Sequence, residues 1–540
     1  MPLRIATDVF AETDAVPLLE LESLLVPAGV TLATIGGNGI SGVGADHRVL
    51  LYGQIQAAVS SIAFSGSNRA SITTGRDALI ASDGDGVAID GDRTTILNRG
   101  TIDSAGGVGI AVTSSDASDV VSTDLPPQDP RFRVTNFGDI SGTVAITTAN
   151  RAAIVTNYGT LVGTSGTALS VGLVPYVTTS PVTSILTNSG RIAGNVLFEG
   201  NSGSSATVRN TGVIDGNLKI ADGLVEFANR GTLDGNLELG SSRGTIINSG
   251  LITGSVSALS DAPDETTFDN SHGTVTGSVS LGGGDDTYIA GENDGLVDGG
   301  DSALGDTDIL DFGKFTRGIT FDGTTESGNS PTNVYSGFEI IYTTGYNDVI
   351  FAPDDKIVIY ARGGNDTIYC GASQTTVLAG NGDDAIIGSS ALDRIYGEAG
   401  NDTIIGNGGA DLIRGGGGND AITVLGGDNE LYGGAGRDTF VFAIGPGFAP
   451  ADQKIYDFSG FKKDGDRINL SAWDANENTK ANEAFTFIGK SAFTGVAGEL
   501  LWLVSGSDVL VRGDLDGDKN WDFTITLKGI STISAADFVL

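Results

Sequence analysis

Five stretches of nine residues decide the fold of this chain: ARGGNDTIY (361–369), AGNGDDAII (379–387), GEAGNDTII (397–405), GGGGNDAIT (415–423) and GGAGRDTFV (433–441). Each stretch has glycine at its fourth position, aspartate at its sixth and an apolar residue at its eighth. They belong to a run of eleven consecutive nonapeptides that continues without insertion from Thr343 to Val441. Such a short, fixed period predicts a solenoid in which every repeat adds the same structural unit.

The eighth position is apolar in all eleven nonapeptides, which predicts one continuous core column with no slip in register. The column consists of Ile350, Ile359, Ile368, Val377, Ile386, Ile395, Ile404, Ile413, Ile422, Leu431 and Phe440.

The nine-residue pattern resembles the G-G-x-G-x-D-x-U-x consensus of the RTX (repeats-in-toxin) calcium-binding repeats. The resemblance implies that each nonapeptide is a turn plus a short strand and that two nonapeptides form one coil of a parallel β-roll. It also implies that Ca²⁺ ions lie between the turns of neighbouring coils. Residues stacked on the same edge of the roll are then 18 positions apart.

Sorted with this spacing, the sixth positions form two unequal edges. The complete edge reads Asp348, Asp366, Asp384, Asp402, Asp420 and Asp438, and the second edge reads Ile357, Thr375, Asp393, Asp411 and Asn429. Carboxylates stacked about 4.8 Å apart repel one another unless a cation lies between them. Ca²⁺ suits this position because it accepts six to eight oxygen ligands, so we expect about five ions on the complete edge and one or two on the second. Glycines at the fourth position supply the turns of the complete edge: Gly364, Gly382, Gly400, Gly418 and Gly436.

Three further acidic segments are candidate calcium sites. LGGGDDTYI (281–289) places Asp286 at the sixth position, and GDTDILDF (305–312) places Asp308 in the same role. In the segment 513–529, Asp514, Asp516 and Asp518 alternate as in a calcium loop. However, Ile525 stands where an EF-hand needs a bidentate glutamate, so a solvated hairpin turn fits this segment as well.

A second repeat, Asn-x-Gly-x-apolar-x-Gly, organises the N-terminal half of the chain. Clear copies are NFGDISG (136–142), NSGRIAG (188–194), NTGVIDG (210–216) and NSGLITG (248–254). A recurrence of about 20 residues with short alternating segments is typical of stacked β-helix coils, in which corner asparagines can form an amide ladder. This section resembles the passenger β-helices of filamentous haemagglutinins and autotransporters. Hairpins of an antiparallel sandwich are the alternative, but the constant offset from the asparagine to the apolar residue favours the β-helix.

After Val441 the chain resembles the C-terminal module of serralysin-type secreted proteins, with DFSGFKKDGDRINLS (457–471) and the closing AADFVL (535–540). The resemblance covers residues 281–540 and implies that the extreme C-terminus is an uncleaved signal for type I secretion. We therefore expect an all-β chain: a right-handed parallel β-helix, a calcium-binding parallel β-roll and a β-rich C-terminal cap. The predicted segments are 1–35 (cap or assembly strand), 36–280 (β-helix), 281–342 (first RTX cluster with inserted strands), 343–441 (β-roll) and 442–540 (C-terminal module).

The composition excludes several classes of function. The 540 residues include 82 glycines, and 67 acidic against 30 basic residues give a net charge of −37, which disfavours binding to nucleic acid or anionic membranes. Cys370 is the only cysteine, so no intrachain disulfide can form. The first 26 residues lack an uninterrupted apolar stretch, and we expect neither a Sec signal peptide nor a membrane-spanning helix.

Two functional hypotheses remain. The first is a secreted, calcium-dependent structural or adhesive protein that self-associates, through residues 1–30, into a surface layer, filament or biofilm matrix of a Gram-negative bacterium. Its expected partners are its own copies, cell-surface polysaccharide and, during export, the type I secretion machinery. The alternative is a polysaccharide lyase or epimerase with a β-helix catalytic domain. We expect no enzyme, because His47 and His272 cannot form the H-E-x-x-H motif of a serralysin peptidase, and catalytic residue types are sparse in the β-helix.

Overall fold

The computed structural model describes residues 3–19, 22–44, 46–113, 132–149, 152–172, 182–200, 204–221, 223–240, 242–258, 265–292, 294–300, 305–324, 334–443, 452–460, 465–479 and 482–540. These residues form two compact units, Met1–Asp306 and Thr307–Leu540, which we call unit 1 and unit 2. No α-helix occurs in the described ranges, and the only helical segment there is the short 3₁₀ turn η2 (Ala535–Asp537). Accordingly, none of their helices is long and apolar enough to cross a membrane.

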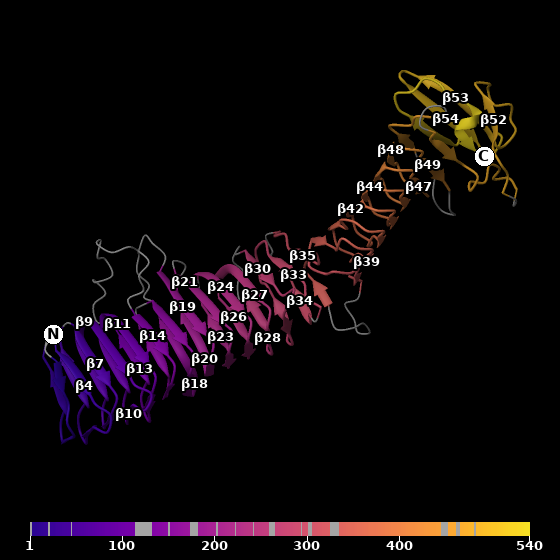
Figure 1. The fold of residues 1–540 in the computed structure, drawn as a ribbon. Helices are drawn as coiled ribbons and strands as arrows, with labels where there is room; N and C mark the ends of the chain where they lie inside the picture. The colour runs from indigo at the N-terminus through magenta and orange to yellow at the C-terminus, as the bar shows by residue number, and fades with distance from the viewer. Residues whose placement is uncertain are drawn as a thin grey trace. The chain divides into compact units, whose positions relative to one another are not determined.

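Unit 1 is a parallel β-solenoid whose coils stack three ladders of strands (Figure 1). The first ladder contains β1 (Leu3–Ile5), β4 (Ser23–Val26), β7 (His47–Leu51), β9 (Ile62–Thr74), β11 (Val87–Asn98), β14 (Phe132–Asn136), β17 (Ala153–Asn157), β19 (Val182–Asn188), β21 (Ser204–Asn210), β24 (Gly223–Asn229), β27 (Ser242–Asn248), β30 (Thr266–Asp269) and β33 (Thr287–Ile289).

The second ladder contains β2 (Val9–Ala11), β5 (Thr31–Thr34), β8 (Gln54–Ala57), β10 (Leu79–Ser82), β12 (Thr101–Ser104), β15 (Asp139–Gly142), β18 (Thr160–Gly172), β20 (Arg191–Glu199), β22 (Val213–Asp215), β25 (Thr232–Asp234), β28 (Leu251–Ile252) and β31 (Thr274–Val275). The third contains β3 (Val16–Leu18), β6 (Ile40–Val43), β13 (Ile110–Thr113), β16 (Ile146–Thr148), β23 (Leu218–Ile220), β26 (Leu237–Leu239), β29 (Val256–Ala258), β32 (Val279–Ser280) and β34 (Leu296–Asp298). The long strands β9, β11, β18 and β20 also contribute to it, by the pairings β6–β9, β11–β13, β16–β18 and β20–β23.

The parallel β-helix prediction is confirmed, and the antiparallel sandwich is excluded for this unit. The repeating asparagines end the first-ladder strands and pair in register, as Asn136 does with Asn157 and Asn188 with Asn210. The glycine two positions later allows close stacking, because a Cβ at Gly190 would overlap the carbonyl oxygen of Gly159. The Asn-x-Gly motif therefore encodes one tightly stacked corner in every coil.

These asparagines form one buried amide ladder, which we call the Asn column. Its members are no more than 1 % exposed: Asn98, Asn136, Asn157, Asn188, Asn210, Asn229, Asn248 and Asn270. Each side-chain NH₂ donates to the Oδ1 of the next member at 2.7–2.9 Å. The Thr74 hydroxyl donates to Asn98 at one end, and Asn270 donates to the Asp294 carboxylate at the other.

Unit 2 contains a β-roll made of two facing parallel sheets. One sheet includes β35 (Ile309–Asp311), β38 (Ile340–Tyr342), β40 (Ile357–Tyr360), β42 (Thr375–Asn381), β44 (Arg394–Ala399), β46 (Leu412–Gly417), β48 (Glu430–Ala435) and β50 (Gln453–Ile455). The short strand β37 (Val334–Ser336) precedes β38 in the chain and is not part of this ladder. The other includes β36 (Thr320–Asp322), β39 (Val349–Phe351), β41 (Thr367–Tyr369), β43 (Ala385–Ile387), β45 (Thr403–Asn407), β47 (Ala421–Val424), β49 (Thr439–Phe442), β51 (Arg467–Asn469) and β56 (Phe538–Val539).

The register of the roll agrees with the predicted 18-residue stacking, since Ile368 pairs with Ile386 and Ile386 with Ile404. All eleven predicted core residues at the eighth position are fully buried. The predicted cluster 281–342 divides between the two units: β33 continues the first ladder of unit 1, where Thr267 pairs with Thr287, whereas β35 lies in unit 2.

The C-terminal module closes the last coil of the roll. It adds β52 (Thr486–Gly489), β53 (Glu499–Ser505), β54 (Asp508–Asp514) and β55 (Phe523–Leu527), with antiparallel β53–β54 and β54–β55 pairs. β55 pairs with β50 of one sheet, and the terminal strand β56 pairs with β51 of the other. Both sheets of the roll are thus covered at this end.

The Asn column predicts a specific cost of substitution in unit 1. Asn188→Ala removes the partners of Asn157 and Asn210 and leaves buried polar groups unsatisfied, so we expect a loss of about 2–4 kcal/mol in unfolding free energy. Thr187→Ala, at the neighbouring half-buried outward position, should change this free energy by at most about 0.5 kcal/mol. Urea denaturation followed by circular dichroism measures both variants, and equal stabilities would contradict a structural role for the column.

Candidate metal centre

The aspartates of the complete edge form a buried column, which we call the Asp column. Its predicted members, from Asp348 to Asp438, are no more than 2 % exposed. The backbone N–H of each aspartate donates to the Oδ1 of the aspartate one coil later at 2.7–3.0 Å. One carboxylate oxygen of each residue therefore fixes the coil spacing, and the second oxygen remains for another partner.

That second oxygen is buried without a hydrogen-bond partner at most positions of the roll. The oxygens concerned are Oδ2 of Asp366, Asp384, Asp402, Asp420 and Asp438 on the complete edge, and Oδ2 of Asp411 on the second edge. A buried anionic oxygen with no donor is costly unless the carboxyl is protonated or a cation binds it. A spherical cation with oxygen ligands satisfies this requirement, and Ca²⁺ accepts such ligands in flexible geometry.

Glycines shape the space around these oxygens. Gly382, Gly400, Gly418 and Gly436 have φ between 134° and 150°, and a Cβ at Gly400 would overlap the carbonyl oxygen of Gly382. Gly364, with φ of 116°, has the corresponding place in the preceding coil. Glycine at the first position of a nonapeptide has a second role, because a Cβ at Gly397 would overlap Oδ2 of Asp402. The repeat pattern alone does not reveal this role, although glycine recurs at the first position of several nonapeptides.

Three aspartates have their second oxygen satisfied by a hydroxyl residue instead. Oδ2 of Asp348 accepts bonds from the N–H and hydroxyl of Thr344, and Oδ2 of Asp393 accepts the same pair from Ser389. Asp466, which the sequence analysis missed, extends the Asp column beyond Asp438. Its Oδ2 accepts bonds from the N–H and hydroxyl of Ser459. These hydroxyl-capped positions leave no free oxygen for a cation.

Asn429 on the second edge shows what the free oxygen faces. Its Oδ1 accepts the N–H of Asp411, as an aspartate would, so its Nδ2 stands where Oδ2 would lie. That Nδ2 donates to the carbonyl oxygens of Gly426 and Gly427 at 2.9 and 3.3 Å. The turn therefore aims carbonyl oxygens at this point, where a positively polarised group fits and a bare carboxylate oxygen does not. The two earlier members of the second edge are not acidic. Thr375 donates its backbone N–H to Asp393, and Ile357 is buried in the core.

Burial alters the proton affinity of the column. It raises the pKa of Asp366, Asp411 and Asp420 to about 7, and the pKa of Asp384 and Asp438 to about 6. Burial raises the pKa of Asp402 as well. Neighbouring carboxylates add to the rise, for example Asp384 and Asp348 around Asp366. Cys370 lies near the second edge, where burial and Asp393 raise the pKa of its thiol to about 12, so it is no activated nucleophile.

The other predicted ligands lie in different settings. Asp286 belongs to unit 1 and accepts the N–H of Thr266, whereas the N–H of Asp308, in unit 2, donates to the Glu339 carboxylate. In the C-terminal module the structure groups Asp514 and Asp516 with Asp522, with ligand atoms within 4.8 Å of one another. Asp518 accepts bonds from Asn520 instead. Both oxygens of Asp514 accept backbone N–H groups, from Gly517 and Lys519, which fits the hairpin-turn alternative.

The raised pKa values predict an inverted pH dependence for the calcium-free roll. Since the pKa rises from 3.8 to about 6–7 on folding, the folded state binds more protons than the unfolded chain between these values. The stability of the calcium-free roll should therefore be greatest below about pH 4 and decline as the pH rises to about 7. Circular dichroism of the chelated protein from pH 4 to 8 measures this, and a gain of β-structure with rising pH would contradict it.

The comparisons with known proteins concern this C-terminal region. Residues 354–540, about a third of the chain, match the family model described as Peptidase M10 serralysin C terminal.

Two solution structures of mannuronan C5-epimerase from Azotobacter vinelandii are similar in part. The AlgE6R2 subunit is 25 % identical over 28 % of this chain and 90 % of its own, with a TM-score of 0.22. The AlgE6R3 subunit is 27 % identical over 29 % and 78 %, with a TM-score of 0.19. No curated protein matches the chain significantly. Residues 354–540 therefore match an RTX-type serralysin C-terminal domain, as the nine-residue repeat predicted.

Proposed function

We propose that the chain is a secreted structural or adhesive protein whose β-roll binds Ca²⁺. The observation that carries the proposal is the row of buried, unpartnered Oδ2 atoms on Asp366, Asp384, Asp402, Asp420 and Asp438, with a further one on Asp411. The five on the complete edge lie in glycine turns at the same place in successive coils. We assign one Ca²⁺ to each of these oxygens and none to the hydroxyl-capped Asp348, Asp393 and Asp466.

Calcium loading would convert the roll from an unstable to a stable structure. Without a cation, the buried carboxylates must either take up protons or leave the interior. Extracellular calcium is commonly in the millimolar range, the affinity class of extracellular modules. Folding of unit 2 would then follow arrival outside the cell, because the complete ligand set exists only in the folded state.

Docking of the C-terminal tail fits export before folding. The Asp537 carboxylate accepts the Ser534 N–H at 2.6 Å, and Phe538, which is 8 % exposed, pairs with Ile468 in the second sheet of the roll. The closing AADFVL is thus part of the folded module. If it is the type I secretion signal that the sequence predicts, it would be accessible only before the roll folds.

An asparagine substitution tests the calcium assignment. Asp420→Asn keeps an Oδ1 acceptor for the Asp402 N–H and replaces the unpartnered oxygen with an NH₂ group, as at Asn429. We expect this variant to bind one Ca²⁺ fewer and to be more stable than the wild type without calcium, because one buried carboxylate is gone. Calcium stoichiometry by atomic emission after gel filtration, together with urea denaturation in chelator, measures both effects.

Asp393→Asn is the matched control. Its new NH₂ group would face the N–H and hydroxyl of Ser389, so this variant should be destabilised with and without calcium while the number of bound ions stays unchanged. An unchanged stoichiometry in Asp420→Asn, or a lost ion in Asp393→Asn, would refute the assignment.

Self-association is supported by the N-terminal coil of unit 1. In the described residues, β1, β2 and β3 each pair on one side only, with β4, β5 and β6. Leu3, Ile5 and Phe10 on this coil are 57 %, 64 % and 79 % exposed. Open strand edges with exposed apolar side chains favour pairing with another chain. The C-terminal module covers the roll's end, so the N-terminal coils of two copies are the surfaces we propose to meet.

Charge placed on this coil tests the association. Phe10→Asp should convert the self-associated protein into monomers, because it puts a carboxylate into an apolar contact, while Val213→Asp, at a 39 % exposed position in the middle of unit 1, should not. Light scattering after size-exclusion chromatography in calcium measures the mass of each. A wild-type protein that stays monomeric at its highest soluble concentration would overturn the proposal. The polysaccharide-modifying alternative stays a prediction.

A further inference from the structure

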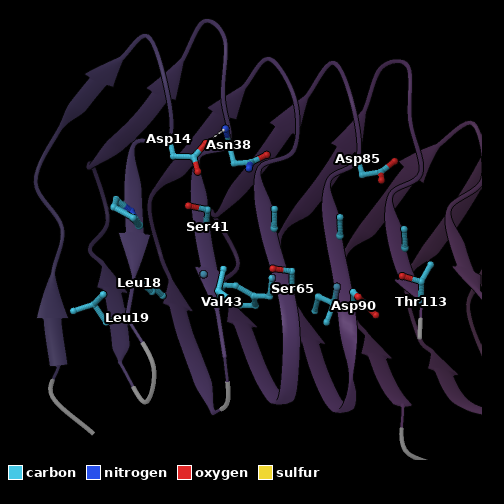
Figure 2. A pocket seen from close by; sticks show the side chains of 17 residues that line it. Asp14, Leu18, Leu19, Asn38, Ser41, Val43, Ser65, Asp85, Asp90 and Thr113 are labelled. Atoms are coloured by element: carbon cyan, nitrogen blue, oxygen red, sulfur yellow. Dashed lines mark hydrogen bonds between the residues drawn. The ribbon is translucent and has the colours of Figure 1, made fainter. Parts of the chain in front are cut away.

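A groove of about 690 Å³ lies over the third ladder of unit 1, near its N-terminal end. Its floor consists of outward-facing residues on β3, β6, β9, β11 and β13 (Figure 2). Strand register places these residues in one column, since Pro17 pairs with Ser41, Ser41 with Ala63, Ala63 with Ala88 and Ala88 with Ala111. Small side chains at consecutive positions leave the face of the sheet hollow.

The hollow depends on this local sequence. Past Ala111 the same outward column continues as Thr147, Ser170, Leu197 and Lys219. Leucine and lysine side chains project far beyond an alanine methyl group and fill the corresponding space. The groove is therefore confined to the first coils and is not a general property of the solenoid.

Two walls of different chemistry flank the floor. Figure 2 shows Asp14, Asn38 and Asp85 along one wall, and Val43 and Asp90 among the residues of the other. Val43 is 71 % exposed and Leu19 is 72 % exposed, so the second wall offers apolar surface as well. A ligand in the groove would meet hydrogen-bonding groups on one side and apolar groups on the floor and the other side.

The first wall keeps hydrogen-bonding capacity free for a ligand. Oδ1 of Asp14 accepts the Asn38 N–H at 2.7 Å, and Oδ1 of Asp85 accepts the Val108 N–H at 2.8 Å. These bonds hold the carboxylates in place. Their second oxygens make no hydrogen bond with any described residue, so they can accept hydroxyl groups, and hydrogen bonds to a carboxylate are the strong kind.

Charge and spacing together select the ligand. Three carboxylates and no Lys, Arg or His line the groove within the described residues, so a polyuronate or other anionic chain would be repelled. An extended peptide repeats its side chains on one face every 6.6–6.8 Å or so, which does not match coils about 4.8 Å apart. A pyranose ring of a linear hexose chain advances by nearly one coil, and its C–H face suits an alanine floor.

We propose that this groove binds a linear, uncharged hexose polysaccharide along the solenoid axis. Pyranose rings lie over Ala63, Ala88 and Ala111, and sugar hydroxyls donate to the free oxygens of Asp14 and Asp85. The site is independent of the calcium binding proposed above, because none of its residues belongs to the β-roll, but it shares β3 with the coil proposed to self-associate.

Calorimetric titration of the full chain in calcium tests the proposal with defined probes. The uncharged probes are cellohexaose, laminarihexaose and mannohexaose, and the charged probes are hexagalacturonate and hexalysine. At least one uncharged hexasaccharide should bind, with both charged oligomers at least tenfold weaker. Absence of binding by all three uncharged probes, or equal or tighter binding of a charged one, overturns the proposal.

Substitutions locate the binding. Ala88→Tyr should weaken the bound hexasaccharide at least tenfold by filling the floor, whereas Ala228→Tyr should leave the affinity unchanged. Ala228 is the matched control because it is also half-buried and outward-facing, in β24 between Arg209 and Ile247. Asp85→Asn retains an acceptor for Val108 but loses its charge, so affinity should fall about fivefold. Circular dichroism verifies folding, and a variant Ala88→Tyr with wild-type affinity would refute the location.

Discussion

The stacking of identical side chains at a fixed coil spacing is the constraint on which both units depend. In a parallel solenoid, every residue faces its counterpart in the coils before and after it, about 4.8 Å away. The nearest polar neighbour of a buried polar side chain is therefore the same residue type in the next coil. Burying such a side chain is favourable only if this repeated contact is favourable.

The Asn column and the Asp column satisfy this constraint in different ways. A primary amide carries both a donor and an acceptor, so each member of the Asn column bonds the next, and the column needs no outside partner. A carboxylate has only acceptors, so each member of the Asp column takes one donor from the backbone and still has an oxygen to satisfy. The Asn column is therefore complete within its own sequence, whereas the Asp column requires protons or cations. At Asn429 an amide takes the place of the carboxylate, and its NH₂ group donates to backbone carbonyl oxygens, so this position needs no proton or cation.

The sequence predicted the repeated parts of this structure and missed those that depend on insertions or on register. The eleven-residue core column and the Asn-x-Gly corners could be found because their spacing is constant. The 18-residue spacing does not lead to Asp466, because Asp466 follows Asp438 by 28 residues. The sequence Asp466-Arg467-Ile468 nevertheless repeats the Asp-x-apolar pattern of the nonapeptides. The capping roles of Thr344, Ser389 and Ser459 depend on side-chain contacts that no spacing reveals. The alanine floor was equally hidden, since Ala63, Ala88 and Ala111 follow at unequal intervals and align only through strand pairing.

The same stacking also arranges outward-facing aromatic side chains of unit 2. Tyrosines in successive coils of its β-roll stack in pairs, with Tyr342 and Tyr360 at 4.6 Å between ring centroids and Tyr432 and Tyr456 at 4.8 Å. The Arg414 guanidinium lies over the Tyr432 ring at 4.7 Å. Ring faces are therefore covered by the neighbouring coil, and mainly the edges of the rings reach solvent. These stacked rings therefore contribute to the stability of the roll. Regular stacking covers side-chain surfaces, and a hollow arises where side chains become small in consecutive coils, as they do on the third ladder of unit 1.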